Sequence, residues 1–131
     1  MKKALAFDIG GTKIYYTVID ENGNLVSDVE KISTPKSLDE IKKFLFSKIA
    51  KFEDVVDVVA IATAGAVNNE NTGVQGSTGN LVDGYGSIDF QSLSKHRVYV
   101  ENDANSAAWV PGSLNWRSLS SWLTLFLPRD L

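Results

Sequence analysis

The sequence contains no cysteine, and its 131 residues include a single histidine, His96. The absence of cysteine excludes disulfide bonds, thiol catalysis and thiolate zinc sites, and it favours a cytoplasmic location. His96 lies between two basic residues just before a predicted strand, so we expect its side chain to be exposed and not catalytic. No spacing of histidine and acidic residues is typical of a zinc site.

A strong excess of one charge and long apolar runs are also missing. Sixteen acidic against thirteen basic residues give a net charge of −3, whereas a dedicated nucleic-acid binder is normally basic. No apolar run approaches the roughly 20 residues that a membrane span requires. The segment Met1–Ala4 leads at once into a strand that contains Asp8, which is not the pattern of a signal peptide. We therefore expect neither a nucleic acid nor a membrane as a partner.

Three short strands are predicted at the start of the chain, at residues 3–9, 13–20 and 25–34. The first two are rich in apolar and β-branched residues, and the third is half polar, as expected near the edge of a sheet. The pair Asn22-Gly23 between the second and third strands is typical of a tight hairpin turn. Together these features predict an antiparallel meander.

An amphipathic helix is expected to begin after Ser37. Ser37 is a favourable N-cap, and Glu40 lies three residues further on, which forms a capping box. Apolar residues then recur every three or four positions, on a face that should pack on the sheet. They are Leu38, Ile41, Leu45, Ile49 and Phe52. The lysines expected to form the solvated side are Lys42, Lys43, Lys48 and Lys51.

The rest of the chain alternates between strand and helix signals. Residues 55–62 form a nearly continuous apolar run that fits a central strand covered on both faces. Residues 68–88 are rich in Asn, Gly, Ser and Thr, so we expect a loop that lines a site, with a short strand at 72–75. The last predicted elements are a short helix at 88–94, a strand at 97–101 and a helix that begins at Ala104.

This order of elements predicts an α/β fold. A hairpin-rich beginning followed by βαβ units indicates a mixed sheet with an antiparallel β-β-β start and helices on its faces. The length of 131 residues suffices for one such domain with a real core and is too short for two full-sized domains.

The connection between the first two strands is the first candidate site. Residues 8–13 read Asp-Ile-Gly-Gly-Thr-Lys. Glycine lets the chain turn tightly and an anion approach closely, and successive N–H groups in such a turn form an anion-binding concavity. Thr12 adds a hydroxyl, Lys13 adds a charge, and Asp8 could hold Mg²⁺ through water. The same residues also fit an ordinary hairpin turn, since the Walker A and dinucleotide spacings are absent.

The second candidate site follows the last predicted strand, at Glu101-Asn102-Asp103. In open α/β sheets ligands bind at the carboxyl ends of the strands. Asp103 is placed to accept a proton from an attacking hydroxyl, and Asn102 offers a donor and an acceptor to vicinal sugar hydroxyls. Gly65, at the end of the neighbouring strand, would let backbone approach the same ligand. Asn and Asp are also favoured N-caps, so a purely structural capping role stays open.

These segments, in this order, resemble the ROK family of sugar kinases, which have the ribonuclease H-like lobes of the actin-like ATPase superfamily. The resemblance covers about residues 1–109. Besides the Asn-Gly hairpin, the residues that carry it are Phe7–Lys13, Ala62–Val67 and Val100–Ala108. The resemblance implies a glucokinase-like enzyme that transfers the γ-phosphate of ATP to a hydroxyl of a hexose or an N-acetylhexosamine.

The same resemblance implies roles for individual residues. The residues that it places at the nucleotide are Gly10, Gly11 and Thr12 on the phosphates, Asp8 near Mg²⁺, and Lys13 alongside. On the sugar side Asp103 is the catalytic base, Asn102 is a sugar ligand and Gly65 lies beside the sugar pocket. The implied cofactors are ATP and Mg²⁺, and the implied partners are a hexose-type sugar and the nucleotide.

The resemblance stops after Trp109. Pro111 and Gly112 should end the last helix, so we interpret 1–109 as the N-terminal lobe of a sugar kinase and 110–131 as a frameshifted or truncated tail. A single lobe would expose apolar surface, through which we expect association into a homodimer, and it would be inactive alone. The alternative is a non-enzymatic actin-like module that binds sugar or nucleotide, or a regulator relative of the same family.

Overall fold

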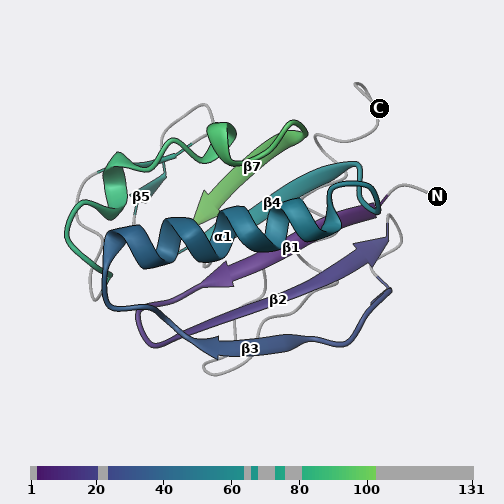
Figure 1. The fold of residues 1–131 in the computed structure, drawn as a ribbon, viewed down its shortest axis with the longest axis horizontal. Helices are drawn as coiled ribbons and strands as arrows, with labels where there is room; N and C mark the ends of the chain where they lie inside the picture. Colours follow the sequence, from purple (N-terminus) through teal and green to yellow (C-terminus); the bar gives the residue numbers. More distant parts are fainter. Residues whose placement is uncertain (1–2, 21–23, 64–65, 68–72, 76–80, 103–131) are drawn as a thin grey trace.

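The structure is a computed structural model that describes residues 3–20, 24–63, 66–67, 73–75 and 81–102. Most of these residues form one five-stranded sheet and a long helix that lies across it (Figure 1). The strands of the sheet are β1 Lys3–Ile9, β2 Lys13–Asp20, β3 Glu30–Ser33, β4 Val58–Thr63 and β7 Arg97–Asn102. The other elements are α1 Leu38–Phe52, the strand pair β5 Ala66–Val67 and β6 Val74–Gln75, and the 3-10 helices η1 Tyr85–Ser87 and η2 Phe90–Leu93.

The five strands lie in the order β3-β2-β1-β4-β7. β1 pairs antiparallel with β2, which pairs antiparallel with β3, whereas β4 is parallel to both β1 and β7. The predicted mixed sheet with an antiparallel start is therefore confirmed. The parallel strands β1, β4 and β7 end at the same edge of the sheet, which we call the carboxyl edge (Figure 1).

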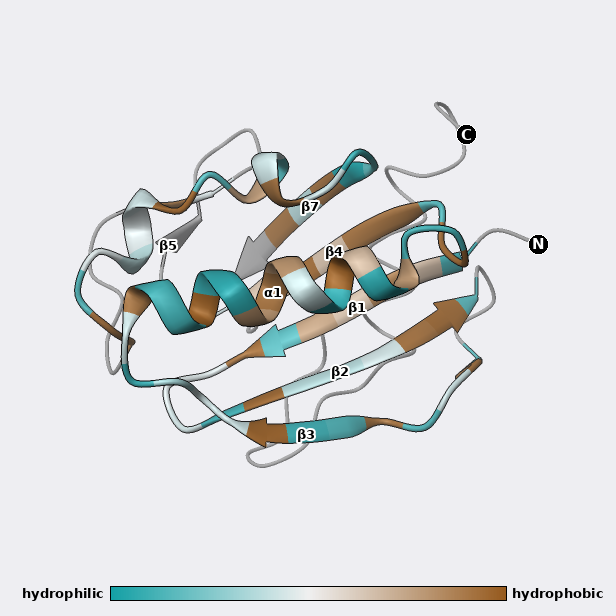
Figure 2. Ribbon diagram, in the orientation of Figure 1, coloured by the Kyte–Doolittle hydropathy of each residue, from teal (hydrophilic) through white to brown (hydrophobic). Residues whose placement is uncertain are grey.

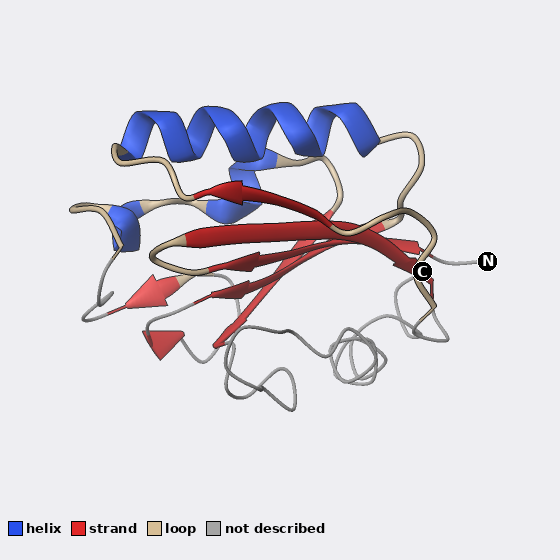
Figure 3. Ribbon diagram, turned by 90° about the horizontal axis from the view of Figure 1, so that it is seen from below, coloured by secondary structure: helices blue, strands red, loops and turns tan. Residues whose placement is uncertain are grey.

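One face of the sheet carries the main core. The helix α1 and the two 3-10 helices all cover this face (Figure 3). Phe7 from β1, Tyr16 from β2 and Phe44 from α1 form a cluster of rings whose centroids lie 5.7 to 6.5 Å apart. Burying an Ile or Leu side chain contributes about 1.5–3 kcal/mol, so the fully buried residues Ile41 and Leu45 attach α1 more strongly than any single hydrogen bond does.

The predicted start of α1 is confirmed. Ser37 is extended, and its hydroxyl accepts a hydrogen bond from the Glu40 N–H group at 3.2 Å. Apolar and polar stretches alternate along the helix, as its banded colours show (Figure 2). Lys48 departs from the predicted solvated side, because it is half-buried and its ammonium lies 5.8 Å from the centre of the Tyr16 ring.

Two predicted strands are shorter than expected, for local reasons. In the strand predicted at 25–34, Leu25 makes a single bridge to Ile19 and the continuous strand β3 begins at Glu30. Between them Ser27 Oγ accepts the hydrogen bond of the Val18 N–H group and so interrupts the ladder. The strand predicted at 55–62 begins at Val58. Val55 is 50% exposed and its N–H group donates to the carbonyl of Phe52, so this residue belongs to the turn that ends α1.

The segment between β4 and β7 also differs in detail. The predicted short strand is present as β6, and the helix predicted at 88–94 is replaced by η1 and η2. His96 is half-buried, with its Nε2 atom 2.6 Å from the carbonyl oxygen of Glu53, so the prediction of an exposed ring was wrong. The Asn22-Gly23 turn and the helix predicted from Ala104 lie outside the described residues. No helix in the described part of the chain is long and apolar enough to cross a membrane.

Candidate functional site

The turn between β1 and β2 lies at the carboxyl edge, where Thr12 is exposed and Gly10 and Gly11 are partly exposed. The Gly10 N–H group donates to the Lys13 carbonyl at 3.0 Å and closes the turn. A Cβ atom on Gly10 would lie 3.3 Å from that carbonyl oxygen, closer than most side chains tolerate, which explains the glycine. Within the described residues the N–H groups of Gly11 and Thr12 have no acceptor. The turn therefore presents two backbone donors that can receive an anion.

Thr34, the residue after β3, holds this turn from the neighbouring strand. Its side chain is only 3% exposed, and its hydroxyl donates to the Gly10 carbonyl at 2.7 Å. Its N–H group donates to the Thr12 carbonyl at 2.9 Å. The ammonium of Lys13 reaches sideways to Ser33 Oγ at 3.3 Å. Thr34 was not found from the sequence, where the one available signal was its place at the end of the strand predicted at 25–34.

Asp8 lies one residue before the end of β1 and is 3% exposed. Phe7 and Ile9 point into the core under α1, so alternation places Asp8 on the opposite face of the sheet. A carboxylate oxygen is the type of ligand that Mg²⁺ takes, directly or through water. The described residues hold no group of three or more histidine, cysteine or acidic side chains suited to a metal.

The second candidate site stands at the same edge. In the register of the parallel strands, Ile9 of β1 is aligned with Thr63 of β4, and Thr63 is aligned with Asn102 of β7. Adjacent strands lie about 4.8 Å apart, so Ile9 and Asn102 are separated by roughly 10 Å. A ligand that lies across three strand ends can therefore meet both the glycine turn and Asn102. Gly65 and Asp103 lie outside the described residues.

A buried tyrosine fixes the end of β4. The hydroxyl groups of Tyr85 and Thr63 are 2.7 Å apart, and both side chains are fully buried. The Tyr85 ring packs edge-on against Phe90, with 5.9 Å between the ring centroids. Burial raises the pKa of the Tyr85 phenol well above its usual range; the hydrogen bond with Thr63 lowers it by a smaller amount, and the charge of Asp8 raises it. The phenol is therefore neutral at physiological pH.

Tyr85 was not found from the sequence, because it falls in the stretch that was predicted as a loop. Its spacing from Thr63 carries no local signal. The apolar residues Ile88, Phe90 and Leu93, which follow it, were the only sign in the sequence that this stretch enters the core.

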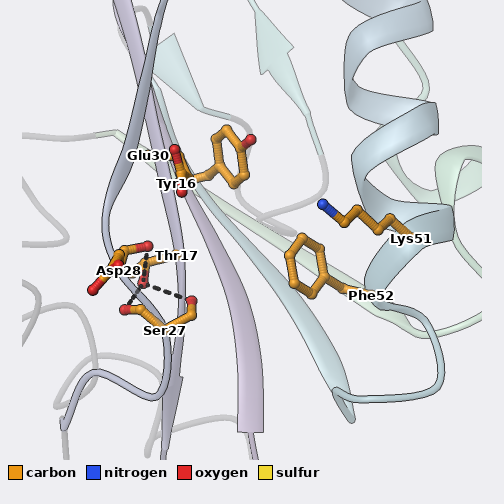
Figure 4. Close-up of a pocket in the computed structure, with 7 residues that line it drawn as sticks. All are labelled: Tyr16, Thr17, Ser27, Asp28, Glu30, Lys51 and Phe52. Carbon is orange, nitrogen blue, oxygen red and sulfur yellow. Dashed lines mark hydrogen bonds between the residues drawn. The ribbon is translucent and has the colours of Figure 1, made fainter.

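A cavity of about 420 Å³ lies elsewhere, between the β2–β3 connection and the last turn of α1 (Figure 4). Tyr16 and Thr17 line it from β2, and Lys51 and Phe52 line it from the end of α1. The other lining residues are Ser27, Asp28 and Glu30. The lining includes no residue of the turn between β1 and β2 and reaches Phe52 at the end of α1, so this cavity is separate from that turn. None of the candidate site residues predicted from the sequence lines it.

Comparison with known proteins gives one consistent family. Residues 4–116 match the ROK family. The chain is 32% identical to an N-acetylmannosamine kinase of Yersinia pestis, with 84% of this chain and 39% of that protein covered. It is 34% identical to a glucokinase of Streptomyces coelicolor, with 83% of this chain and 35% of that protein covered. The family match ends seven residues beyond Trp109, and the boundary predicted there stays a prediction.

A solved structure gives the same result for the fold. The ROK family glucokinase from Streptomyces griseus, in complex with glucose and AMPPNP, aligns with a TM-score of 0.66 and 31% sequence identity. The alignment covers 82% of this chain and 35% of that chain. The chain thus spans little more than a third of the length of the proteins that it matches.

Proposed function

This chain belongs to the ROK family, and we propose that it supplies the phosphate-binding turn and the sugar-binding strand ends of an ATP-dependent, glucokinase-like sugar kinase. The observation that carries the proposal is the alignment of Ile9, Thr63 and Asn102 at one edge of three parallel strands. Relatives named glucokinase and N-acetylmannosamine kinase support a hexose or an N-acetylhexosamine as the substrate class.

The nucleotide half of the site is the turn after β1. Gly11 and Thr12 direct backbone N–H groups toward a phosphate, and Lys13 adds positive charge beside them. Asp8 is suited to Mg²⁺, directly or through its water ligands. Bound ATP with Mg²⁺ supplies the γ-phosphoryl group. Phosphoryl transfer depends chiefly on positioning and charge stabilisation, which such a turn provides.

The sugar half of the site is the set of strand ends that follow β4 and β7. Asn102 presents an amide to vicinal hydroxyls, and the backbone at Gly65 approaches the sugar closely. Asp103 accepts the proton of the attacking hydroxyl, the step that most needs a base at this site. Asn102 stands at the required edge of the sheet, and the roles of Gly65 and Asp103 rest on the family pattern.

Three further properties belong to the proposal. We expect a cytoplasmic protein, and association of two copies through apolar surface. We expect the 131 residues by themselves to transfer phosphate slowly or not at all, because one turn stabilises the phosphate charge from one side only.

Calorimetric titration of the chain with ATP·Mg²⁺ and with glucose or N-acetylmannosamine tests the proposal. Asp8→Asn should weaken ATP·Mg²⁺ binding at least tenfold, about 1.4 kcal/mol, and leave sugar binding unchanged. Asp28→Asn is the matched control, because Asp28 is exposed and lies away from the edge. Urea denaturation of each variant checks that it is folded. Equal ATP affinity in the Asp8 variant and the control would contradict the nucleotide assignment.

Phosphate transfer is measured on the same samples with radiolabelled ATP. Asp103→Asn should abolish any phosphate transfer without changing the affinity for sugar. If the variant loses both phosphate transfer and sugar binding, Asp103 has only the structural role of a helix N-cap. Sugar binding with no ATP binding at all would favour the non-enzymatic module over the kinase.

A further inference from the structure

Two buried hydroxyl groups make hydrogen bonds to the two halves of the carboxyl edge, and neither belongs to a residue proposed to contact a ligand. Thr34 bonds to the glycine turn, and Tyr85 bonds to the end of β4. Each reaches the edge from a distant part of the sequence, at separations of 24 and 22 residues. The two hydroxyls have different partners, so each can be removed without touching the other bond.

The Thr34 bond acts on the backbone that carries the phosphate donors. The carbonyl groups of Gly10 and Thr12 both accept from Thr34, so the Gly10–Gly11 and Thr12–Lys13 peptide planes are held. The direction of a peptide carbonyl also fixes the direction of the N–H group in the same plane. Thr34 therefore sets where the Gly11 N–H group points, although its own side chain is buried and out of reach of a ligand.

The Tyr85 bond acts on the other side of the edge. Thr63 is the last residue of β4 and is the register partner of Asn102. Its hydroxyl is held by a phenol whose ring is itself fixed against Phe90. Burial keeps the phenol neutral and able to donate. The position of Thr63 at the end of β4 thus depends on a side chain from η1.

We propose that Thr34 and Tyr85 are positioning residues that act separately, Thr34 for the nucleotide phosphates and Tyr85 for the sugar. The assignment of each half to its ligand rests on the proposed function. The division itself rests on the two hydrogen bonds. Neither residue contacts a ligand, so each acts through the backbone that it holds.

The test compares Thr34→Val and Tyr85→Phe, each of which removes one hydroxyl with little change of shape. A hydrogen bond of this kind is worth roughly a three- to tenfold change in an equilibrium constant. Thr34→Val should weaken ATP·Mg²⁺ binding by that factor and leave the affinity for glucose unchanged. Tyr85→Phe should weaken glucose binding and leave the affinity for ATP·Mg²⁺ unchanged. If both variants weaken both ligands equally, the proposed division is wrong.

The chain offers a matched control for each variant. Thr17 is 2% exposed, and its hydroxyl donates to the Ser27 carbonyl at 2.9 Å, away from the edge. Tyr16 is a buried tyrosine in the middle of β2. Thr17→Val and Tyr16→Phe should change neither affinity. A control that lowers ligand affinity as much as its matched variant would show that only general stability is being measured.

A measurement without ligand separates this proposal from the proposed function. In hydrogen–deuterium exchange, Thr34→Val should speed exchange of the Gly10 amide roughly three- to tenfold, and Tyr85→Phe should do so at Thr63. The Leu5 and Val59 amides, which lie away from the carboxyl edge, should not change. Equal acceleration at all four amides would overturn the positioning roles. If exchange changes locally but the wild-type chain binds neither ligand, the proposed function is wrong, whereas the positioning roles of Thr34 and Tyr85 in the backbone are supported.

Discussion

The turn that carries Tyr85 begins at Gly84, whose φ of +82° lies in the left-handed region. A Cβ atom at this position would lie 3.0 Å from Leu38 Cδ2, at the start of α1. For an L residue the left-handed conformation costs about 1–2 kcal/mol, and moving the half-buried Leu38 side chain adds to it. We therefore expect Gly84→Ala to lower the free energy of unfolding by about 2 kcal/mol.

The neighbouring glycine is the control. A Cβ atom on Gly86 would lie 3.5 Å from the Val74 carbonyl oxygen, an ordinary contact, and its φ is not positive. Gly86→Ala should be neutral or stabilising by up to about 1 kcal/mol, because alanine restricts the unfolded chain. In urea denaturation, with a slope of about 2 kcal/mol per molar, the midpoints of the two variants should differ by about 1 M.

The two glycine variants can refute the reasoning in either direction. Equal midpoints would show that the left-handed conformation at Gly84 is not needed, and that the turn relaxes without cost. A larger loss for Gly86→Ala would place the sensitive contact at β6 and not at α1. If Gly84→Ala lowers stability but leaves amide exchange at Thr63 unchanged, the stability of this turn does not depend on the hydrogen bond between Tyr85 and Thr63.

Three other outcomes are expected. In thermal melts, Ser37→Ala should lower the free energy of unfolding by about 1 kcal/mol, because the N-cap hydrogen bond is lost. The control Ser47→Ala, at an exposed position within α1, should raise it slightly. Leu45→Ala should cost about 2–5 kcal/mol because it opens a cavity in the core, and a loss below 1 kcal/mol would contradict the packing described. The raised pKa of Tyr85 makes a contribution to stability that is complete below about pH 10, the ordinary pKa of tyrosine. This contribution is lost as the pH rises above that value, because the unfolded chain then releases a proton that the folded chain keeps. Tyr85→Phe should remove this part of the alkaline loss in urea titrations, and an unchanged slope would show that the phenol ionises normally.

The features that sequence reasoning predicted well are those with a local cause. The strands at 3–9 and 13–20, the cap at Ser37 and the apolar face of α1 each depend on residues within a few positions of one another. The strand that was expected from residue 25 is interrupted between a bridge at Leu25 and β3, where the side chain of Ser27 takes the place of a backbone acceptor. Composition and alternation contain no sign of that competition.

The candidate site divides in the same way. The glycine turn and Asn102 follow from motif and strand order, and the register puts both at one edge. Thr34 and Tyr85 could not be predicted, because each acts through a bond to a residue more than 20 positions away. A threonine or tyrosine gives the same local signal whether it packs in a core or holds a turn. Only the folded chain distinguishes the two.

Paramagnetic relaxation can show directly whether a nucleotide binds at the carboxyl edge. Mn²⁺·ATP is added to the isotope-labelled chain, and broadening of backbone amide signals is mapped. The account predicts the strongest broadening at Gly11 and Thr12, with broadening also at Thr63 and Asn102, and none at Asp20 or Arg97 at the opposite ends of their strands. Broadening at Asp20 and Arg97, or none at Gly11 and Thr12, would contradict a nucleotide site at the carboxyl edge.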